Sequence, residues 1–199
     1  EALAPLLATG RVTAAALIAL ADAREADLND DGFARRDDFF AYLDATSGAL
    51  NLLMLDVLGA GRDGATREAA RRIGRAFGIL GHLRAAAINA SQGRVVLPRD
   101  LLDDHGTGPA ELLVGQPGPA LEDAARELGF IAAGELAGAR GLAHDMRRVA
   151  LPVLVLARFC DAYLARLKRG GWNLFAPGIE PLPITVPLLV VRAWMSGRY

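Results

Sequence analysis

The sequence predicts an all-α protein, and three observations support this. Ala, Leu, Gly and Arg dominate its 199 residues, and aromatic residues make up only 6%. Strand-favouring β-branched residues are sparse outside two short runs at 149–156 and 184–191. Apolar residues recur every three to four positions along much of the chain, which is the spacing of amphipathic helices. A chain of this length is most simply one domain, so we expect residues 1–199 to form a single helical domain.

Four helices are predicted in the first half. Residues 1–8 already have a helical pattern, and Thr13 can cap a helix over 13–28. One face of that second helix is filled by Leu17, Ile18, Leu20 and Ala21. A third helix is expected over 36–58 and a fourth over 65–90, with a glycine-rich turn between them. The apolar stripe of the third helix, which we expect in the core, contains Phe39, Phe40, Leu43, Leu50, Leu53, Met54 and Val57.

The second half reads as two short helices followed by three longer ones. The short helices are expected over 101–105 and 110–114, separated by Gly/Pro-rich loops. A long helix over 119–145 contains many Gly and Ala residues, so a neighbouring helix can approach its backbone closely. Helices over 149–167 and 183–194 complete the predicted bundle.

Composition excludes several classes of function. The net charge of −1 gives no overall field that would attract nucleic acid or an anionic membrane. Cys160 is the only cysteine, so an internal disulfide or a thiolate metal cluster is not possible, and its apolar neighbours predict a buried structural thiol. No apolar stretch reaches the roughly 20 residues of a membrane span. We therefore expect a soluble protein that is at most peripheral to a membrane.

The stretch 74–100, GRAFGILGHLRAAAINASQGRVVLPRD, carries the most specific signal. It resembles the second signature of the squalene/phytoene synthase family, Q-L-x-N-I-x-R-D-x-x-E-D followed by G-R-x-Y-L-P. The second half is kept by Gly93, Arg94, Leu97 and Pro98, and Arg84 occupies the position of the Arg in the R-D pair. The resemblance implies an isoprenoid synthase-type bundle of antiparallel helices around a central cavity.

The departures from that signature fall on its chemistry. In the family, the aspartates of this helix hold Mg²⁺ against a prenyl diphosphate. The matching positions here are Ala85, Ile88 and Asn89, and alkyl groups cannot ligate a hard cation that needs anionic oxygens. Tyr42 is kept before Thr46-Ser47-Gly48, but Ala45 replaces a later aromatic residue of the family pattern. We therefore expect no catalytic residue, no metal site and no cofactor in this chain.

The resemblance extends over nearly the whole chain. Arg24 to Leu28 and the segment 162–177, with Tyr163, Trp172 and Phe175, are similar to other family motifs. The pattern is nearest to a branch regarded as non-catalytic, which acts in building respiratory complex I at the inner membrane. A member of the family would carry further helices before residue 1, including its first aspartate-rich motif. We therefore expect that N-terminal helices are missing from the sequence.

Four residues are candidates for binding a diphosphate-like group or for a structural role. Arg84 and Arg94 can each fork a phosphate, or can instead tie the signature helix to the extended run that follows it. Tyr42 is kept from the family pattern. His82 lies one turn beyond Gly78 on the signature helix, where a single His more often has a structural role than a catalytic one.

Asp27 and Asp31 are weak metal candidates. They have the D-x-x-x-D spacing of a prenyltransferase metal motif. They also belong to the stretch 27–32, which matches the first half of a calcium-binding loop, D-x-N-x-D-G. The turn residues between them interrupt a helix, and Arg35 with Asp38 departs from the calcium pattern at its ninth and twelfth positions. A helix-end role for Asp27, with Arg24 as its partner, is the interpretation we prefer.

Three functions follow from the resemblance. The first is a catalytically degenerate member that acts as an assembly or scaffold factor, with respiratory-complex subunits or assembly proteins as partners. The second is an active Mg²⁺-dependent prenyltransferase that joins two prenyl diphosphates in isoprenoid biosynthesis. The third is a protein that binds an isoprenoid or another lipid in its cavity. The first implies a location in the bacterial cytoplasm at the inner membrane, or in the mitochondrial matrix of a eukaryote.

Overall fold

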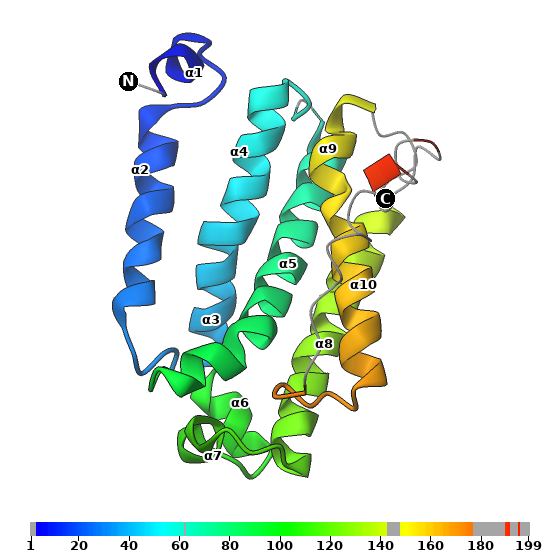
Figure 1. Cartoon of the computed structure of the whole chain (residues 1–199). Coiled ribbons are helices and arrows are strands. Elements are labelled where there is room, and N and C mark those ends of the chain that lie inside the picture. Colours follow the sequence, from blue (N-terminus) through cyan, green and yellow to red (C-terminus); the bar gives the residue numbers. More distant parts are fainter. Residues whose placement is uncertain (1–2, 62, 143–147, 177–189, 192–194, 196–199) are drawn as a thin grey trace.

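The computed structural model describes residues 3–61, 63–142, 148–176, 190, 191 and 195, and all regular structure within them is helical. This confirms the all-α prediction (Figure 1). The elements in chain order are α1 (Ala4–Ala8), α2 (Ala14–Ala23), η1 (Arg24–Leu28), α3 (Arg36–Leu43), η2 (Asp44–Gly48), α4 (Ala49–Leu58), α5 (Gly64–Ser91), α6 (Arg99–Asp104), α7 (Pro109–Val114), α8 (Pro119–Gly141), η3 (Arg148–Ala150), α9 (Leu151–Leu154) and α10 (Leu156–Arg169).

Helix α5 is the central element of the bundle. The residue before it, Asp63, accepts a hydrogen bond from the Thr66 N–H at 2.7 Å through its side chain and so caps the first turn. Helices α3 and α4 lie on one side of it and α8, α9 and α10 on the other, while α6 and α7 close one end (Figure 1). Small buried residues allow α5 and α8 to pack closely, among them Ala69, Ala70, Ala76, Ala124, Ala125 and Ala132.

The helices break at points that the apolar pattern did not reveal. The helix predicted over 36–58 is continuous in direction but contains a π-helical turn, η2, between α3 and α4. The helix predicted over 13–28 ends at Ala23 and continues as the 3₁₀ turn η1. The helix predicted over 149–167 is divided into η3, α9 and α10. The prediction over 183–194 and the end of the one over 119–145 lie outside the described residues.

The expected apolar stripe is correct for α3, but on α4 three of its four residues are exposed and the fourth, Leu53, is half-buried. Phe39 and Leu43 are completely buried, as predicted. On α4 the predicted core residues Leu50, Met54 and Val57 are 44%, 42% and 37% exposed. The buried face carries Asn51 and Leu55 instead, because the Asn51 Nδ2 donates to the Ala70 carbonyl oxygen of α5 at 3.0 Å.

Helix α2 is also more exposed than its sequence suggests. None of its residues is fully buried, and Ile18, which was predicted to face the core, is 59% exposed. It stands at the outer side of the bundle, beside α4 (Figure 1). None of the helices in the described part of the chain is both long enough and apolar enough to cross a bilayer.

Candidate functional site

A close contact between α5 and the π-helical turn positions one wall of the site. A Cβ atom placed on Gly74 would lie 2.5 Å from the Ser47 carbonyl oxygen and 2.8 Å from the Gly48 Cα. Gly78 is similarly close to the side chains of Leu43 and Ser47. The absence of side chains at these two glycines therefore allows η2 to lie against α5 and brings Ser47, with Tyr42 just before it, to the edge of α5.

The extended run after α5 forms the opposite wall. It is held beside the segment after η1 by three backbone hydrogen bonds: Val95 N to Asp30 O, Arg99 N to Phe33 O, and Asp100 N to Ala34 O. Gly32 has a φ of +67°, and a Cβ there would lie 2.1 Å from the Val95 carbonyl oxygen. Glycine is therefore required at this crossing, which fixes Arg94 next to η1.

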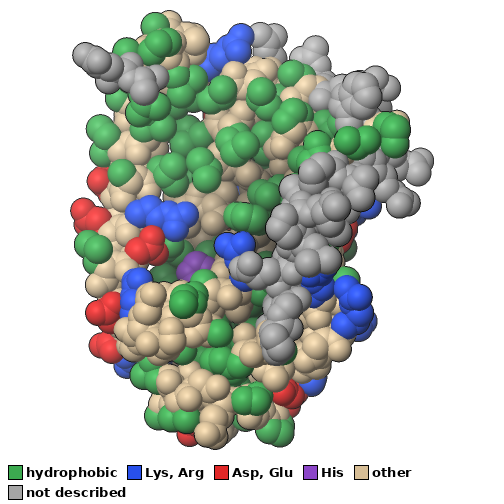
Figure 2. All heavy atoms as spheres, viewed as in Figure 1, with side chains coloured by type: hydrophobic (Ala, Val, Ile, Leu, Met, Phe, Trp, Pro, Cys, Tyr) green, Lys and Arg blue, Asp and Glu red, His purple; other side chains and the backbone are tan. Residues whose placement is uncertain are grey.

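Between these walls lies a cleft of about 380 Å³. Its lining comes from η1, α3, η2, α5 and the extended run: Arg24, Asp27, Tyr42, Ser47, Phe77, Gly78, Gly81, His82, Ala85, Asn89, Arg94 and Val96. Figure 2 shows a hollow on this face with a histidine at its floor and both acidic and basic side chains around it.

The charged groups of the cleft are paired with one another. The Tyr42 hydroxyl donates to Asp27 Oδ1 at 2.5 Å, and Arg24 Nη1 lies 2.9 Å from that hydroxyl and 3.3 Å from Asp27 Oδ2. Arg94 donates to the Asp27 carbonyl oxygen, and its Nε lies 2.9 Å from Asp30 Oδ1. Burial and the hydrogen bond to Asp27 raise the pKa of Tyr42 to about 12, so this phenol stays protonated at neutral pH.

His82 is held at the floor by its own helix and by aromatic rings. Its Nδ1 lies 2.9 Å from the Gly78 carbonyl oxygen. The rings of Phe39 and Tyr42 meet it edge to face, with centroids 5.0 and 5.7 Å away. Burial lowers the pKa of His82, so the imidazole is neutral at physiological pH.

The residues at the signature positions do not fit a magnesium ion. Ala85 and Asn89 line the cleft, while Ile88 is 58% exposed. The Asn89 Nδ2 donates to the Ala85 carbonyl oxygen of its own helix at 2.9 Å. Among the described residues of the lining Asp27 is the one carboxylate, whereas Mg²⁺ is usually held by carboxylates together with substrate phosphates. Across the described residues, no three His, Cys, Asp or Glu side chains converge as a metal site would require.

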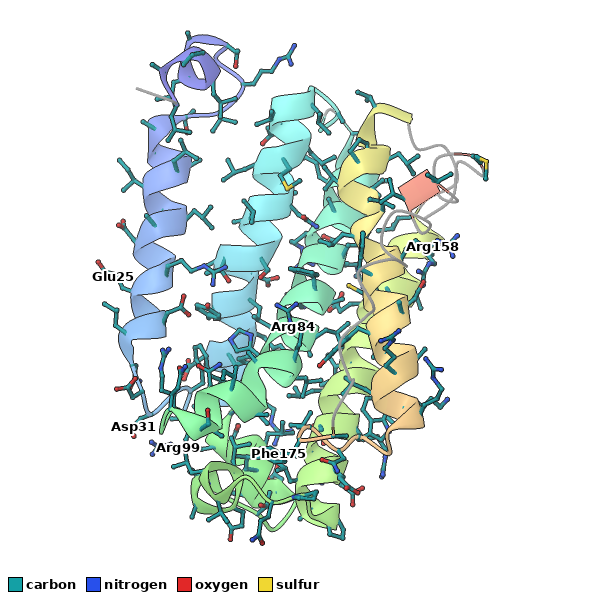
Figure 3. All side chains as sticks on the ribbon, in the orientation of Figure 1. Glu25, Asp31, Arg84, Arg99, Arg158 and Phe175 are labelled. Carbon is teal, nitrogen blue, oxygen red and sulfur yellow. The ribbon has the colours of Figure 1, made fainter. Side chains whose placement is uncertain are left out.

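The structure separates the other candidate residues. Tyr42, His82, Arg94 and Asp27 come together in the cleft. Arg84 is exposed and is not part of the lining, although it lies on the same helix (Figure 3). Asp31 does not share a face with Asp27: its carboxylate is 83% exposed and pairs with Arg99 at 3.1 Å.

Sequence reasoning did not assign Ser47, Phe77 and the two glycines Gly78 and Gly81 to the site. The family motif at Thr46-Ser47-Gly48 could have identified Ser47, but the π-helical turn decides where the Ser47 side chain points. The predicted partnership of Arg24 with Asp27 is observed at 3.3 Å. Cys160 is buried, and this burial raises the pKa of its thiol to about 12, as expected for a structural cysteine.

The chain is similar to assembly factors of respiratory complex I. NADH dehydrogenase (ubiquinone) complex I, assembly factor 6, from Mus musculus is 28% identical over 184 residues, which are 92% of this chain and 55% of that protein. The Homo sapiens protein of the same name is 26% identical over 179 residues, which are 89% of this chain and 54% of that protein. The chain thus spans about half the length of these relatives.

A solved structure and a sequence family agree with this similarity. The crystal structure of squalene synthase HpnC from Alicyclobacillus acidocaldarius superposes with a TM-score of 0.76 over 84% of this chain and 64% of that one. Its sequence is 17% identical, so this likeness supports the fold alone. The sequence model of squalene/phytoene synthases matches residues 1–188. The chain therefore belongs to the squalene/phytoene synthase family.

Proposed function

We propose that this protein is a catalytically degenerate member of its family that acts as an assembly or scaffold factor for respiratory complex I. The observation that carries the proposal is the floor of the cleft. Ala85 and Asn89 occupy positions where the family signature places metal-binding aspartates, and the carboxylate of Asp27 is already engaged by Tyr42 and Arg24.

The energetic consequence is large. A diphosphate leaving group depends on a metal ion to stabilise the negative charge that develops on its oxygens, and this stabilisation contributes several kcal/mol. The cleft offers two arginines, but both are paired with aspartate groups. Through these contacts Arg94 joins η1 and the residues after it to the extended run, whereas Arg24 links η1 to Tyr42 of α3.

The similarity to complex I assembly factors supports the second part of the proposal. Those relatives are named for assembling NADH dehydrogenase complex I, and the matched region covers 92% of this chain in the mouse protein. Respiratory-complex subunits or assembly proteins are therefore the proposed partners. The proposed location is the face of the inner membrane where complex I is built, with peripheral attachment.

The enzymatic part is tested by adding farnesyl and geranylgeranyl diphosphate to the full-length protein with and without Mg²⁺. We expect calorimetry to show no Mg²⁺-dependent binding and product analysis to show no released pyrophosphate. Mg²⁺-dependent turnover would overturn the degenerate assignment and would favour the prenyltransferase. The double substitution Ala85→Asp and Asn89→Asp is the positive control, because it returns two carboxylates to the floor of the cleft and should restore Mg²⁺-dependent binding.

The assembly part is tested by deleting the gene in its own host. We expect the amount of assembled complex I to fall, and complex I subunits to copurify with the tagged full-length protein from the complemented strain. Normal complex I levels in the deletion strain would contradict this part of the proposal.

A further inference from the structure

The hydrogen-bonding groups of the cleft fall into two sets. The charged groups and Tyr42 form ion pairs or hydrogen bonds with one another and with their neighbours: Arg24 Nη1 and Tyr42 with the Asp27 carboxylate, and Arg94 with the Asp30 carboxylate and the Asp27 backbone. Three uncharged groups have no partner among the described residues: the His82 Nε2, the Asn89 Oδ1 and the Ser47 hydroxyl. The uncharged groups of the cleft therefore keep hydrogen-bonding capacity that a ligand can use.

The His82 Nε2 can be assigned as an acceptor. Its Nδ1 lies 2.9 Å from the Gly78 carbonyl oxygen, and a carbonyl oxygen can only accept. The ring is neutral, so the proton is on Nδ1 and the Nε2 carries a lone pair. His82 lines the cleft, and its ring makes edge-to-face contacts with the rings of Phe33, Phe39 and Tyr42.

A second hydrogen-bond acceptor lies on the same face of α5 as His82. His82, Ala85 and Asn89 are spaced by three and four residues, which places them on the same side of a helix. The Asn89 Nδ2 is used by the Ala85 carbonyl oxygen, which leaves its Oδ1 as a second acceptor. The methyl group of Ala85 between them leaves room above the floor.

From this arrangement we propose that the cleft binds, without a metal, an uncharged amphiphile whose hydroxyl group donates a hydrogen bond to the His82 Nε2. A carboxylate has no proton to donate at neutral pH, and a phosphate monoester, with a second pKa of about 6, has lost most of its own, so either group would leave this acceptor largely unsatisfied. An alcohol supplies the proton, and its oxygen can accept from the Ser47 hydroxyl in return.

The rest of the cleft suits an apolar tail. Phe77, which is 43% exposed, and Val96 belong to the lining. Figure 2 shows hydrophobic side chains gathered above the hollow, over α2 and α4. The volume of about 380 Å³ lies within the range of roughly 300–1,000 Å³ that is usual for small-molecule sites.

The test is ligand-observed NMR on the full-length protein with two isomeric probes, 1-octanol and 1-methoxyheptane. They have the same atoms and almost the same apolar surface, but the ether oxygen cannot donate a hydrogen bond. We expect 1-octanol to bind about five- to tenfold more tightly, the ratio that one hydrogen bond typically gives. Equal affinity of the two probes would overturn the proposal, as would tighter binding of octyl phosphate than of 1-octanol.

Three variants locate the site. His82→Phe keeps an aromatic ring among its aromatic neighbours and removes the acceptor, so we expect the preference for 1-octanol to disappear. Ala85→Leu fills the floor with His82 intact and should abolish binding of both probes. Arg84→Ala, on the exposed side of the same helix, should change the affinity for neither probe.

A preference for 1-octanol that survives His82→Phe would overturn the proposal. The inference does not rest on the assembly role, because it is tested by binding alone.

Discussion

The two halves of α5 carry polar clusters of opposite character. In the first half, Arg71, Arg72 and Arg75 pair with three acids, which are Asp44 of η2, Glu68 of α5 itself and Glu135 of α8. In the second half, the cleft groups leave neutral acceptors without partners. The first cluster satisfies itself and joins three elements, whereas the second leaves hydrogen-bonding capacity open. The comparison indicates that the first half is scaffold, and it supports the proposal that the second half carries the site.

The largest effect is expected from Gly74→Ala, which tests the scaffold half. The added Cβ would lie 2.5 Å from the Ser47 carbonyl oxygen, and this backbone cannot move without displacing η2. We expect a loss of about 2–3 kcal/mol in the free energy of unfolding, measured by chemical denaturation. Gly134→Ala in α8 is the matched control, because its Cβ would meet nothing within 4 Å. That control should stabilise by about 0.5–1 kcal/mol, and equal effects of the two would contradict the close contact.

Glu135→Gln tests the charge cluster. Its carboxylate, only 14% exposed, accepts from Arg75 at 2.9 Å and from Arg72 at 3.4 Å. Removing this charge should cost about 1–2 kcal/mol of stability, because hydrogen bonds to charged groups are the stronger ones. Asp37→Asn is the control. The Asp37 side chain pairs with Arg35 but is 80% exposed, so its loss should change stability by less than about 0.5 kcal/mol. A loss no larger than in the control would show that the cluster is only a surface network.

The pH dependence of stability tests His82 in the site half. Burial lowers its pKa in the folded protein, whereas an unfolded His titrates near about 6.5. Between the folded and the unfolded pKa, the unfolded chain binds more protons than the folded protein. The contribution of His82 to the free energy of unfolding is therefore fully present above about pH 6.5 and decreases as the pH falls toward the folded pKa. The slope from this one group cannot exceed about 1.4 kcal/mol per pH unit.

His82→Phe should remove that component of the pH dependence. Arg71 lowers the pKa of Glu68, so the stability that Glu68 contributes is lost only as the pH falls below its ordinary pKa of 4.5. The pH range in which Glu68 acts is therefore separate from that of His82. Denaturant titrations of both proteins between pH 7 and 5 give the comparison. Identical pH dependence in the two proteins would contradict the neutral, buried state of His82.

The smallest effects are expected from the two arginines of the signature stretch. Arg94→Ala removes the ties to Asp30 and to the Asp27 backbone, and should cost about 1 kcal/mol. Arg84→Ala should stay within about 0.5 kcal/mol of the parent, because the side chain is exposed. Thermal unfolding of the pair measures the difference, and a larger loss for Arg84→Ala would reverse the assignment.

Much of the fold could be predicted from local pattern. Helix α5, expected over 65–90, runs from Gly64 to Ser91, because a capping Asp and a long apolar period are local signals. The family signature likewise identified Ala85 and Asn89 as positions that now line the cleft. The orientation of α4 could not be predicted in this way. It is apolar on most sides, and the side that faces the core is shown only in the folded structure, by the bond from Asn51 to Ala70 and by the burial of Leu55.

The sequence by itself determined the helical class, the long central helix and the residue types available for chemistry, because these depend on spacing and composition along the chain. The tertiary structure alone decided which of those residues meet. Arg84 and Arg94 had equal standing in the sequence, yet Arg94 is drawn into the cleft by the crossing at Gly32, while Arg84 remains outside. The reason is that the crossing joins residues more than sixty positions apart, and no local signal records such a contact.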